Sequence, residues 1–264
     1  MLIAQISDMH IKKPGELLYG RIDTQGFLER AVAHVNALDP SPDIALVTGD
    51  LVDGGKPEEY ANLKRMLGAL RMPYYLIPGN HDARDPLRAA FPEHSYLPRD
   101  GFLQYVVEDL PLRLIALDTL VPGKGHGALR PEQLEWLQAR LDESDKPTLL
   151  FMHHPPFDCG IEALDNALLG EGAERLAAIV RARGTVERVL CGHVHRPIQV
   201  RWAGTMASIA PSTAHQATLD LRPGAKLSMT MDPPGIALHL WRPQTGLITH
   251  LSYVGPYEGP RPFA

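Results

Sequence analysis

Five apolar stretches of this 264-residue sequence each run directly into side chains that can bind a metal ion. The stretches are apolar along their whole length, which is typical of strands in a sheet that helices cover on both faces. The C-terminal ends of such strands meet at one edge of the sheet, where their loops form a shared site. We therefore expect one cluster made of Asp8, His10, Asp50, Asn80, His153, His193 and His195.

The same stretches define the expected secondary structure. We expect strands at 2–6, 44–48, 74–78, 112–118, 148–152 and 187–191, and helices at 24–38, 57–70, 131–142 and 172–183. After residue 197, further strands are expected at 197–203, 205–211, 236–242 and 247–253, with an irregular stretch at 218–235. We expect a single domain, residues 1–264, in which segment 205–240 forms a cap or a contact between subunits. Taken alone, the residues suggest one doubly wound sheet.

The types of ligand limit which metal can bind. Two carboxylates, one amide and four imidazoles provide oxygen and nitrogen donors without sulfur, which suits Mn, Fe, Co, Zn or Ni better than Ca²⁺ or a zinc–thiolate site. Seven ligands are too many for one ion with an open position, but they suit two ions about 3.5–4 Å apart that share a carboxylate and a water. Such ions lower the pKa of that water toward about 7, and the resulting bridging hydroxide can attack phosphorus in line with the leaving oxygen.

Several of these residues also have simpler explanations. Asp, Asn and Gly favour turns, so each motif alone predicts a turn or a cap, and only the ordered set predicts a site. Spacing alone leaves open whether His153 or His154 is the ligand, and we expect a structural or outer role for His154. Asp53 and Asp82 are expected to orient imidazoles rather than to bind metal. His126, in the loop GKGHG, is expected to be solvated.

The ordered motifs resemble a known family. Asp8-x-His10, Gly49-Asp50-x-x-Asp53, Gly79-Asn80-His81-Asp82, His153 and Gly192-His193-x-His195 are similar to the motifs of the calcineurin-like metallophosphoesterases. The segments SDMH, LIPGNHD, MHHPP, CGHVH and PSTAHQ resemble more narrowly the class III cyclic-nucleotide phosphodiesterases and the bacterial glycerophosphodiesterases, over about residues 1–216. The resemblance implies a four-layer αββα sandwich with a small β-rich cap or dimerisation segment near the C-terminus.

The resemblance also implies a role for each residue of the cluster. One divalent ion would be held by Asp8, His10 and His195, the other by Asn80, His153 and His193, and Asp50 would bridge the two. His81 would contact the phosphate of the substrate or protonate the leaving group, as a catalytic residue together with Asp50. Asn80 and His215 would also lie at the substrate. Relatives pair through a C-terminal excursion, so a homodimer or larger oligomer is expected.

The function expected from these residues is hydrolysis of small phosphodiesters, either 3′,5′-cyclic nucleotides or glycerophosphodiesters. A phosphomonoesterase or broad-specificity phosphoesterase is the main alternative. A non-catalytic metal-binding scaffold is a further alternative, which the presence of all seven ligands and His81 disfavours.

Charge and composition exclude other classes of partner. The net charge is −5, the pI is about 6.2, and Lys and Arg form no runs, so neither a nucleic acid nor an anionic membrane is expected as a partner. The first residues lack the basic region and long apolar region of a signal peptide, and no stretch of 18 apolar residues is present. We expect Cys159 and Cys191 to be reduced and the protein to be cytoplasmic.

Overall fold

Two sheets, rather than one, contain the buried strands. The computed structural model describes residues 1–259 and 261–263. The first sheet has the strand order β13 (Gly246–Tyr253), β12 (Gly235–Arg242), β1 (Leu2–Ile6), β2 (Ile44–Thr48) and β3 (Tyr74–Ile77). The second has the order β4 (Tyr105–Val107), β5 (Arg113–Leu117), β6 (Thr148–Met152), β7 (Val186–Cys191), β9 (Thr205–Ile209) and β8 (Ile198–Trp202). The single doubly wound sheet suggested by the residues alone is therefore wrong, and the αββα sandwich is confirmed.

The position of β12 explains why the sheet divides. On one side β1 pairs in parallel with β2, and on the other it pairs antiparallel with β12, with Leu2 opposite Leu240. Because β12 occupies that side of β1, the later parallel strands β5, β6 and β7 form a separate sheet. The C-terminal strands β8, β9, β12 and β13 thus complete the two sheets.

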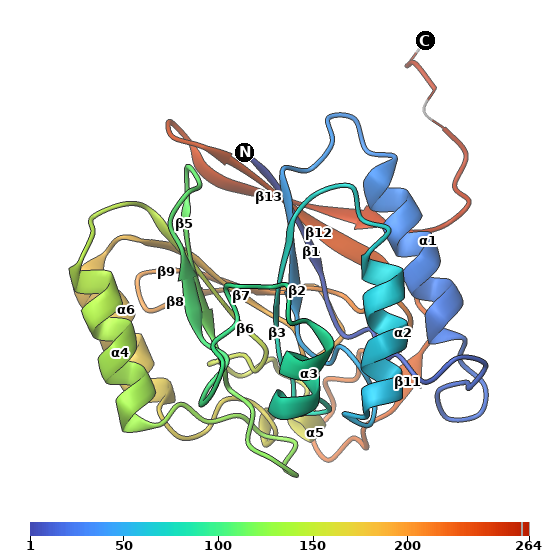
Figure 1. The fold of residues 1–264 in the computed structure, drawn as a ribbon, viewed down its shortest axis with the longest axis horizontal. Helices are drawn as coiled ribbons and strands as arrows, with labels where there is room; N and C mark the ends of the chain where they lie inside the picture. Colours follow the sequence, from blue (N-terminus) through green and yellow to red (C-terminus); the bar gives the residue numbers. More distant parts are fainter. Residues whose placement is uncertain (260, 264) are drawn as a thin grey trace.

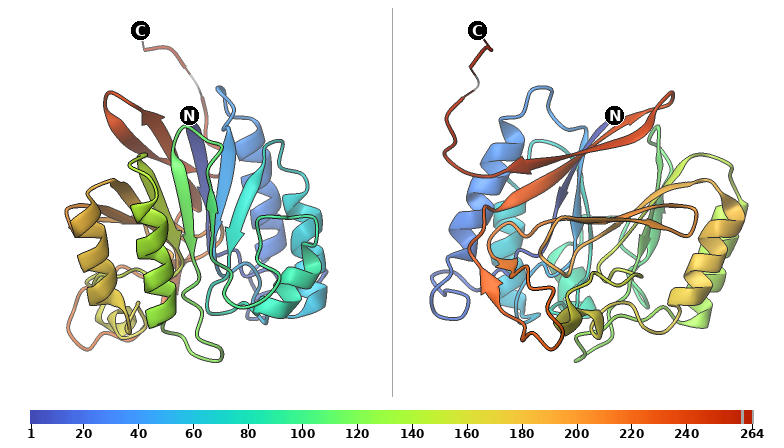
Figure 2. Two further views of the ribbon diagram at one scale, coloured as in Figure 1. Left: turned by 60° about the vertical axis from the view of Figure 1, so that its left-hand side comes forward. Right: turned by 180° about the vertical axis from the view of Figure 1, so that it is seen from behind.

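Helices cover the outer face of each sheet (Figures 1 and 2). The first sheet is covered by α1 (Thr24–Asn36), α2 (Pro57–Leu67) and α3 (Arg84–Ala90), and the second by α4 (Pro131–Asp142) and α6 (Ala173–Arg183). Both α2 and α4 begin with a proline, which fits the first turn of a helix because its missing N–H has no partner there. Four helices are confirmed close to their predicted bounds. Five short elements of the described chain were not predicted: α3, β4, α5 (Glu162–Asp165), β10 (Gln216–Ala217) and β11 (Met229–Thr230).

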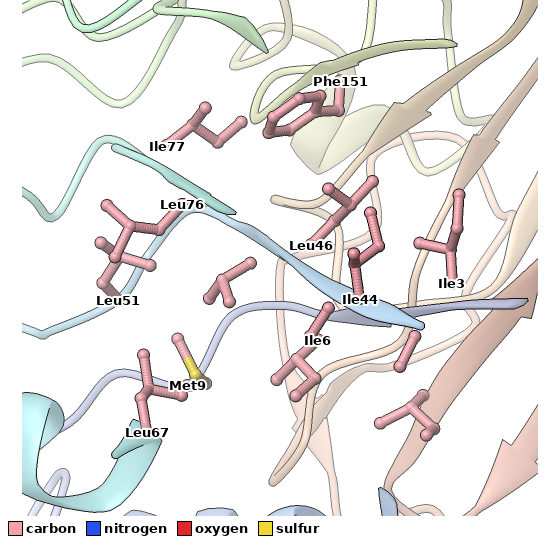
Figure 3. Close-up of a cluster of buried hydrophobic side chains, with 14 of the residues drawn as sticks. Ile3, Ile6, Met9, Ile44, Leu46, Leu51, Leu67, Leu76, Ile77 and Phe151 are labelled. Atoms are coloured by element: carbon pink, nitrogen blue, oxygen red, sulfur yellow. The ribbon is translucent and has the colours of Figure 1, made fainter. Parts of the chain in front are cut away.

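A buried apolar core joins the two sheets. Phe151 of β6 belongs to the same buried cluster as Leu46 of β2 and Ile77 of β3 (Figure 3). The other face of the first sheet contributes side chains such as Ile6, which cluster with Leu67 of α2 (Figure 3). Contact on both faces holds the strands firmly, so the loops at their ends are fixed in position.

Segment 205–240 begins and ends inside the sheets, because it contains β9 and most of β12. Between them the chain forms a small two-stranded ribbon of β10 (Gln216–Ala217) and β11 (Met229–Thr230), with an irregular loop between its strands. We call residues 218–232 the excursion. None of the helices in the described part of the chain is long and apolar enough to cross a membrane.

Candidate metal centre

The seven predicted ligands come from both sheets. Asp8 and His10 follow β1, Asp50 follows β2 and Asn80 follows β3, all in the first sheet. His153 follows β6, and His193 and His195 follow β7, in the second sheet. The C-terminal ends of the two sets of parallel strands converge, so the site lies between two sheets instead of along one edge.

Hydrogen bonds cross between the sheets at this point. Gln5 Nε2 donates to Cys191 O at 2.9 Å, and the backbone N–H of His193 donates to Asp8 Oδ1 at 2.9 Å. Gly192 allows this close approach, because an added Cβ would lie 2.7 Å from Thr48 O. Gly49 also cannot be replaced by a residue with a side chain, because an added Cβ would lie 2.7 Å from His153 Cγ. Its φ of 88° also favours glycine. The glycines of the GD and GH motifs are therefore needed for the sheets to meet.

The first group of candidate ligands consists of Asp8, His10, Asp50 and His195, whose ligand atoms lie within 4.8 Å of one another. His10 Nε2 lies 3.1 Å from His195 Nε2 and 3.5 Å from Asp50 Oδ2. His195 Nε2 also lies 3.5 Å from Asp8 Oδ1. These donors surround a common point.

The second group lies on the other side of Asp50. Asp50 Oδ1 is 3.3 Å from His153 Nε2, which is 3.1 Å from Asn80 Oδ1. Asn80 Oδ1 in turn lies 3.0 Å from His193 Nδ1. One oxygen of Asp50 therefore faces each group, as a bridging carboxylate requires.

The backbone at these positions is strained. Among the described residues, seven other than glycine have positive φ, and five of them are predicted ligands: Asp8 (55°), His10 (44°), Asp50 (46°), His193 (75°) and His195 (54°). A residue other than glycine seldom adopts such a conformation, and each instance costs about 1–3 kcal/mol unless the surroundings impose it. Such strain is typical of functional sites, and here it turns the side chains inward.

Backbone carbonyls fix the orientation of several imidazoles. Nδ1 of His153 donates to Thr48 O at 2.9 Å, and Nδ1 of His195 donates to His215 O at 3.1 Å. Each ring therefore presents an Nε2 lone pair to the cluster, as metal-binding histidines do. His153, not His154, thus faces Asp50 and Asn80.

The electrostatics favour a cation in the cluster. Burial lowers the pKa of His193 and of His195 to about 3, so both are neutral near pH 7 and have a free lone pair. Burial opposes a charge on His153, but the neighbouring Asp50 carboxylate raises its pKa to about 9. Burial opposes the negative charge of Asp50, but the neighbouring imidazoles of His153, His10 and His81 together hold its pKa well below the usual range. The field that favours a proton here also favours a metal ion.

Unpaired polar atoms support the same conclusion. Asp8 Oδ2 and His193 Nε2 are buried and have no hydrogen-bond partner among the described residues. Buried polar atoms are nearly always paired, so such atoms call for another partner. The donor set, its spacing and these orphaned atoms fit divalent metal ions.

His81 lies beside the cluster without joining either of the two groups. Its Nδ1 donates to Asp53 O at 2.9 Å, and the ring borders a cavity above the ligands. The carboxylate of Asp53 lies 3.5 Å from both His10 Nδ1 and His81 Nδ1, and Lys12 Nζ holds its other oxygen at 3.0 Å. Asp53 therefore lies where it can orient imidazoles, as predicted.

Asp82 does not orient an imidazole, so that prediction is wrong. Its buried carboxylate accepts hydrogen bonds from the backbone N–H groups of Gly79 at 2.7 Å and Leu51 at 3.1 Å, and from the Tyr60 hydroxyl at 2.9 Å. The first two donors belong to the loops that carry Asn80 and Asp50. Asp82 therefore fastens two ligand loops together.

Two other histidines are not among the predicted ligands, although a ring nitrogen of His154 lies within 4.8 Å of ring nitrogens of His153 and His193. His154 is buried behind His193, with ring centroids 4.7 Å apart, and its Nδ1 lies 2.7 Å from Thr119 Oγ1. This contact fits the structural role predicted for His154. His126 is exposed and does not line the cavity, whereas its neighbour Gly125 does.

The cavity above the ligands has a volume of about 400 Å³ and contains the residues predicted to meet the substrate. Asn80, His81 and His215 all line it. The His215 ring lies 4.7 Å from that of His195. Sequence reasoning missed other lining residues, such as Tyr19 and Leu227, because they come from irregular loops without a motif.

Comparison with known proteins decides the family. The model of the calcineurin-like phosphoesterase family matches residues 1–197. The chain belongs to the calcineurin-like phosphoesterases. The family resemblance inferred from the motifs is thereby confirmed.

Relatives of this phosphoesterase are named as phosphodiesterases. A probable glycerophosphodiester phosphodiesterase of Arcobacter nitrofigilis is 42% identical over 264 residues, covering 100% of this chain and 97% of the relative. A probable cyclic nucleotide phosphodiesterase of Rhodopseudomonas palustris is 34% identical, covering 98% and 94%. Among solved structures, a dimetal phosphatase of Danio rerio has a TM-score of 0.66 over 97% of this chain and 99% of its own, and at 16% identity this likeness shows the fold. The chain is thus a hydrolase of this family.

Proposed function

We propose that this calcineurin-like phosphoesterase hydrolyses small phosphodiesters, namely 3′,5′-cyclic nucleotides, glycerophosphodiesters or both, with two divalent ions. The observation that carries the proposal is the position of Asp50, whose two oxygens face two separate groups of donors. We assign Asp8, His10 and His195 to one ion, Asn80, His153 and His193 to the other, and Asp50 to both. The donor chemistry fits Mn, Fe, Zn or Co.

The metal ions, when bound, would supply an activated water and neutralise charge at phosphorus. The protein positions the substrate above them. Nδ1 of His81 donates to Asp53 O, so a second proton on the ring would sit on Nε2. Nε2–H could then donate to a phosphate oxygen or give its proton to the leaving alkoxide. His215 lines the same cavity. Burial lowers the pKa of His215 to about 3, so the ring is neutral near pH 7. It can therefore donate one hydrogen bond to the substrate or accept one from it.

The test compares a diester and a monoester with the same leaving group. After loading with Mn²⁺, the protein should turn over bis(p-nitrophenyl) phosphate more efficiently than p-nitrophenyl phosphate. Asp50→Asn should abolish activity and metal binding, whereas Asp145→Asn, whose side chain is 94% exposed, should change neither. A preference for the monoester would favour the phosphomonoesterase alternative. No turnover with any of the four metals would favour a non-catalytic scaffold.

We also propose that the chain is one domain and forms a homodimer or a larger oligomer through segment 205–240. Exposed apolar side chains support this, since Leu221 and Met231 are 64% and 55% exposed. Leu221→Asp should lower the mass found by analytical ultracentrifugation, and a monomeric wild type would refute the proposal.

We propose a cytoplasmic location and no nucleic-acid partner. Cys159 and Cys191 are both free thiols, which suits a reducing compartment. The net charge of −5 disfavours binding to a polyanion. Fractionation of the native cells tests the location, and a filter-binding assay with DNA and RNA tests the second point.

A further inference from the structure

The cavity above the candidate metal ligands has two chemically different sides. Its floor consists of imidazoles and carboxylate or amide oxygens, such as those of Asp50 and Asn80. Its wall includes Leu164 of α5, and Leu227 and Met229 of the excursion. The floor is suited to the phosphate, so the wall is left to meet one of the alcohols esterified to it.

The wall is a built part of the molecule. Gly224 N donates to Glu162 Oε2 at 2.7 Å, which ties the excursion to α5. Arg196 Nη1 donates to Ala217 O at 2.6 Å and to Asp232 Oδ2 at 3.0 Å, which holds both ends of the excursion. Figure 1 shows α5 and β11 at the same end of the molecule.

Packing also fixes the side chains of the wall. Met229 packs against the buried side chains of Leu18 and Ile22. Leu164 is itself buried, with 7% of its surface exposed. Leu227 differs, because it borders the cavity while 57% of its surface remains exposed. Its apolar surface is therefore available to a ligand.

The wall carries no charged side chain among the described residues. None of the described residues that line the cavity is Lys or Arg, and the one carboxylate, Asp50, belongs to the floor. The hydroxyls of Tyr19 and Ser228 are the neutral polar side-chain groups away from the floor. A polyol placed here would lose hydrogen bonds to water that apolar side chains do not replace.

We propose that Leu227, together with Leu164 and Met229, makes the enzyme selective for phosphodiesters in which one alcohol carries an apolar ring or chain. Such a group gains by covering the exposed face of Leu227, whereas a glycerol group does not. This inference rests on the proposed diesterase function and specifies its substrate class.

The experiment uses two diesters that share phosphocholine and differ only in the second alcohol. These are p-nitrophenyl phosphocholine, with an apolar ring, and glycerophosphocholine, with a polyol. Their consumption by the Mn²⁺-loaded full chain is followed by ³¹P NMR, so that both are measured in the same way. The variant is Leu227→Ser, and the matched control is Leu219→Ser, because Leu219 lies on the same excursion, is 61% exposed and does not line the cavity.

Leu227→Ser should lower kcat/KM for the aryl ester about tenfold, the size of effect seen when a small apolar contact in a substrate pocket is lost. The value for glycerophosphocholine should change less than about twofold, and Leu219→Ser should leave both values unchanged. Equal losses on both substrates, no loss on the aryl ester, or the same loss in Leu219→Ser would overturn the selectivity. If the wild type consumes neither substrate but still hydrolyses bis(p-nitrophenyl) phosphate, the selectivity is refuted while the diesterase function stands. If bis(p-nitrophenyl) phosphate is not hydrolysed either, the diesterase function itself is refuted.

Discussion

Replacing Asp82 with Asn tests whether a buried carboxylate joins the loops of the metal centre at a cost in stability. The side chain accepts four hydrogen bonds, from Gly79 N, Leu51 N, Val52 N and the Tyr60 hydroxyl. An asparagine has only one oxygen, so its NH₂ group faces two of these donors. Each unpaired buried donor costs about 1–3 kcal/mol, and we expect the variant to be less stable by about 2–4 kcal/mol at pH 5.

The size of this difference should depend on pH. Burial raises the pKa of Asp82 from 3.8 to about 6. A raised carboxyl pKa adds stability that is fully present below pH 3.8 and is lost as the pH rises through about 6. The full shift of the pKa corresponds to about 3 kcal/mol, of which about 1.4 kcal/mol is lost between pH 5 and pH 7.5. Asparagine does not titrate, so the wild type and Asp82→Asn should differ less at pH 7.5 than at pH 5.

The free energies of unfolding of the wild type and of Asp82→Asn are measured at pH 5.0 and at pH 7.5. Each is obtained by urea denaturation in EDTA, followed by tryptophan fluorescence. Other groups titrate equally in both proteins and cancel in the difference. The exposed Asp145→Asn variant should show no such dependence on pH. A difference between wild type and Asp82→Asn that stays constant or widens as the pH rises would refute the reasoning.

Three further predictions concern the ligands and their neighbours. His153→Ala should lose its bound metal, as measured by elemental analysis. His154→Ala should keep the metal, but its free energy of unfolding in urea should be lower by about 1–3 kcal/mol. The reverse pattern would show that His154 is the ligand. His81→Ala should keep its metal content but turn over bis(p-nitrophenyl) phosphate about 10²–10⁴-fold more slowly, and loss of the metals would rule out this role. Gly192→Ala should destabilise the protein by about 1–3 kcal/mol in thermal unfolding, because its Cβ would collide with Thr48 O, and an unchanged Tm would show that the sheets can separate freely.

The strands and long helices were predictable because local patterns determine them. The strand Ile44–Thr48 is buried at all five positions, and Pro131–Asp142 begins with a proline at the predicted residue. The division into two sheets was not predictable from those patterns. It depends on the pairing of Leu2 with Leu240, which is a contact between distant parts of the chain that no local pattern records.

In the candidate site too, residues that follow a local pattern were predictable and the others were not. Motif residues such as Asp50 and His195 were predictable because each directly follows a recognisable strand. Leu227 and Tyr19 were not, since they reach the cavity from irregular loops. Asp82 was misjudged because the sequence places it beside histidines, whereas the fold directs it to backbone N–H groups.

The pairing of β1 with β12 has a consequence for biosynthesis. During synthesis, β1 lacks its partner on one side until Gly235–Arg242 has been made, more than two hundred residues later. At about 5–20 residues per second, that wait lasts on the order of ten seconds or more. During this time an apolar strand keeps an open edge, which is a template for aggregation. A nascent or truncated chain that ends before β12 is therefore expected to need a chaperone, and we expect the loops of the metal centre to be fixed in position only after β12 has been made.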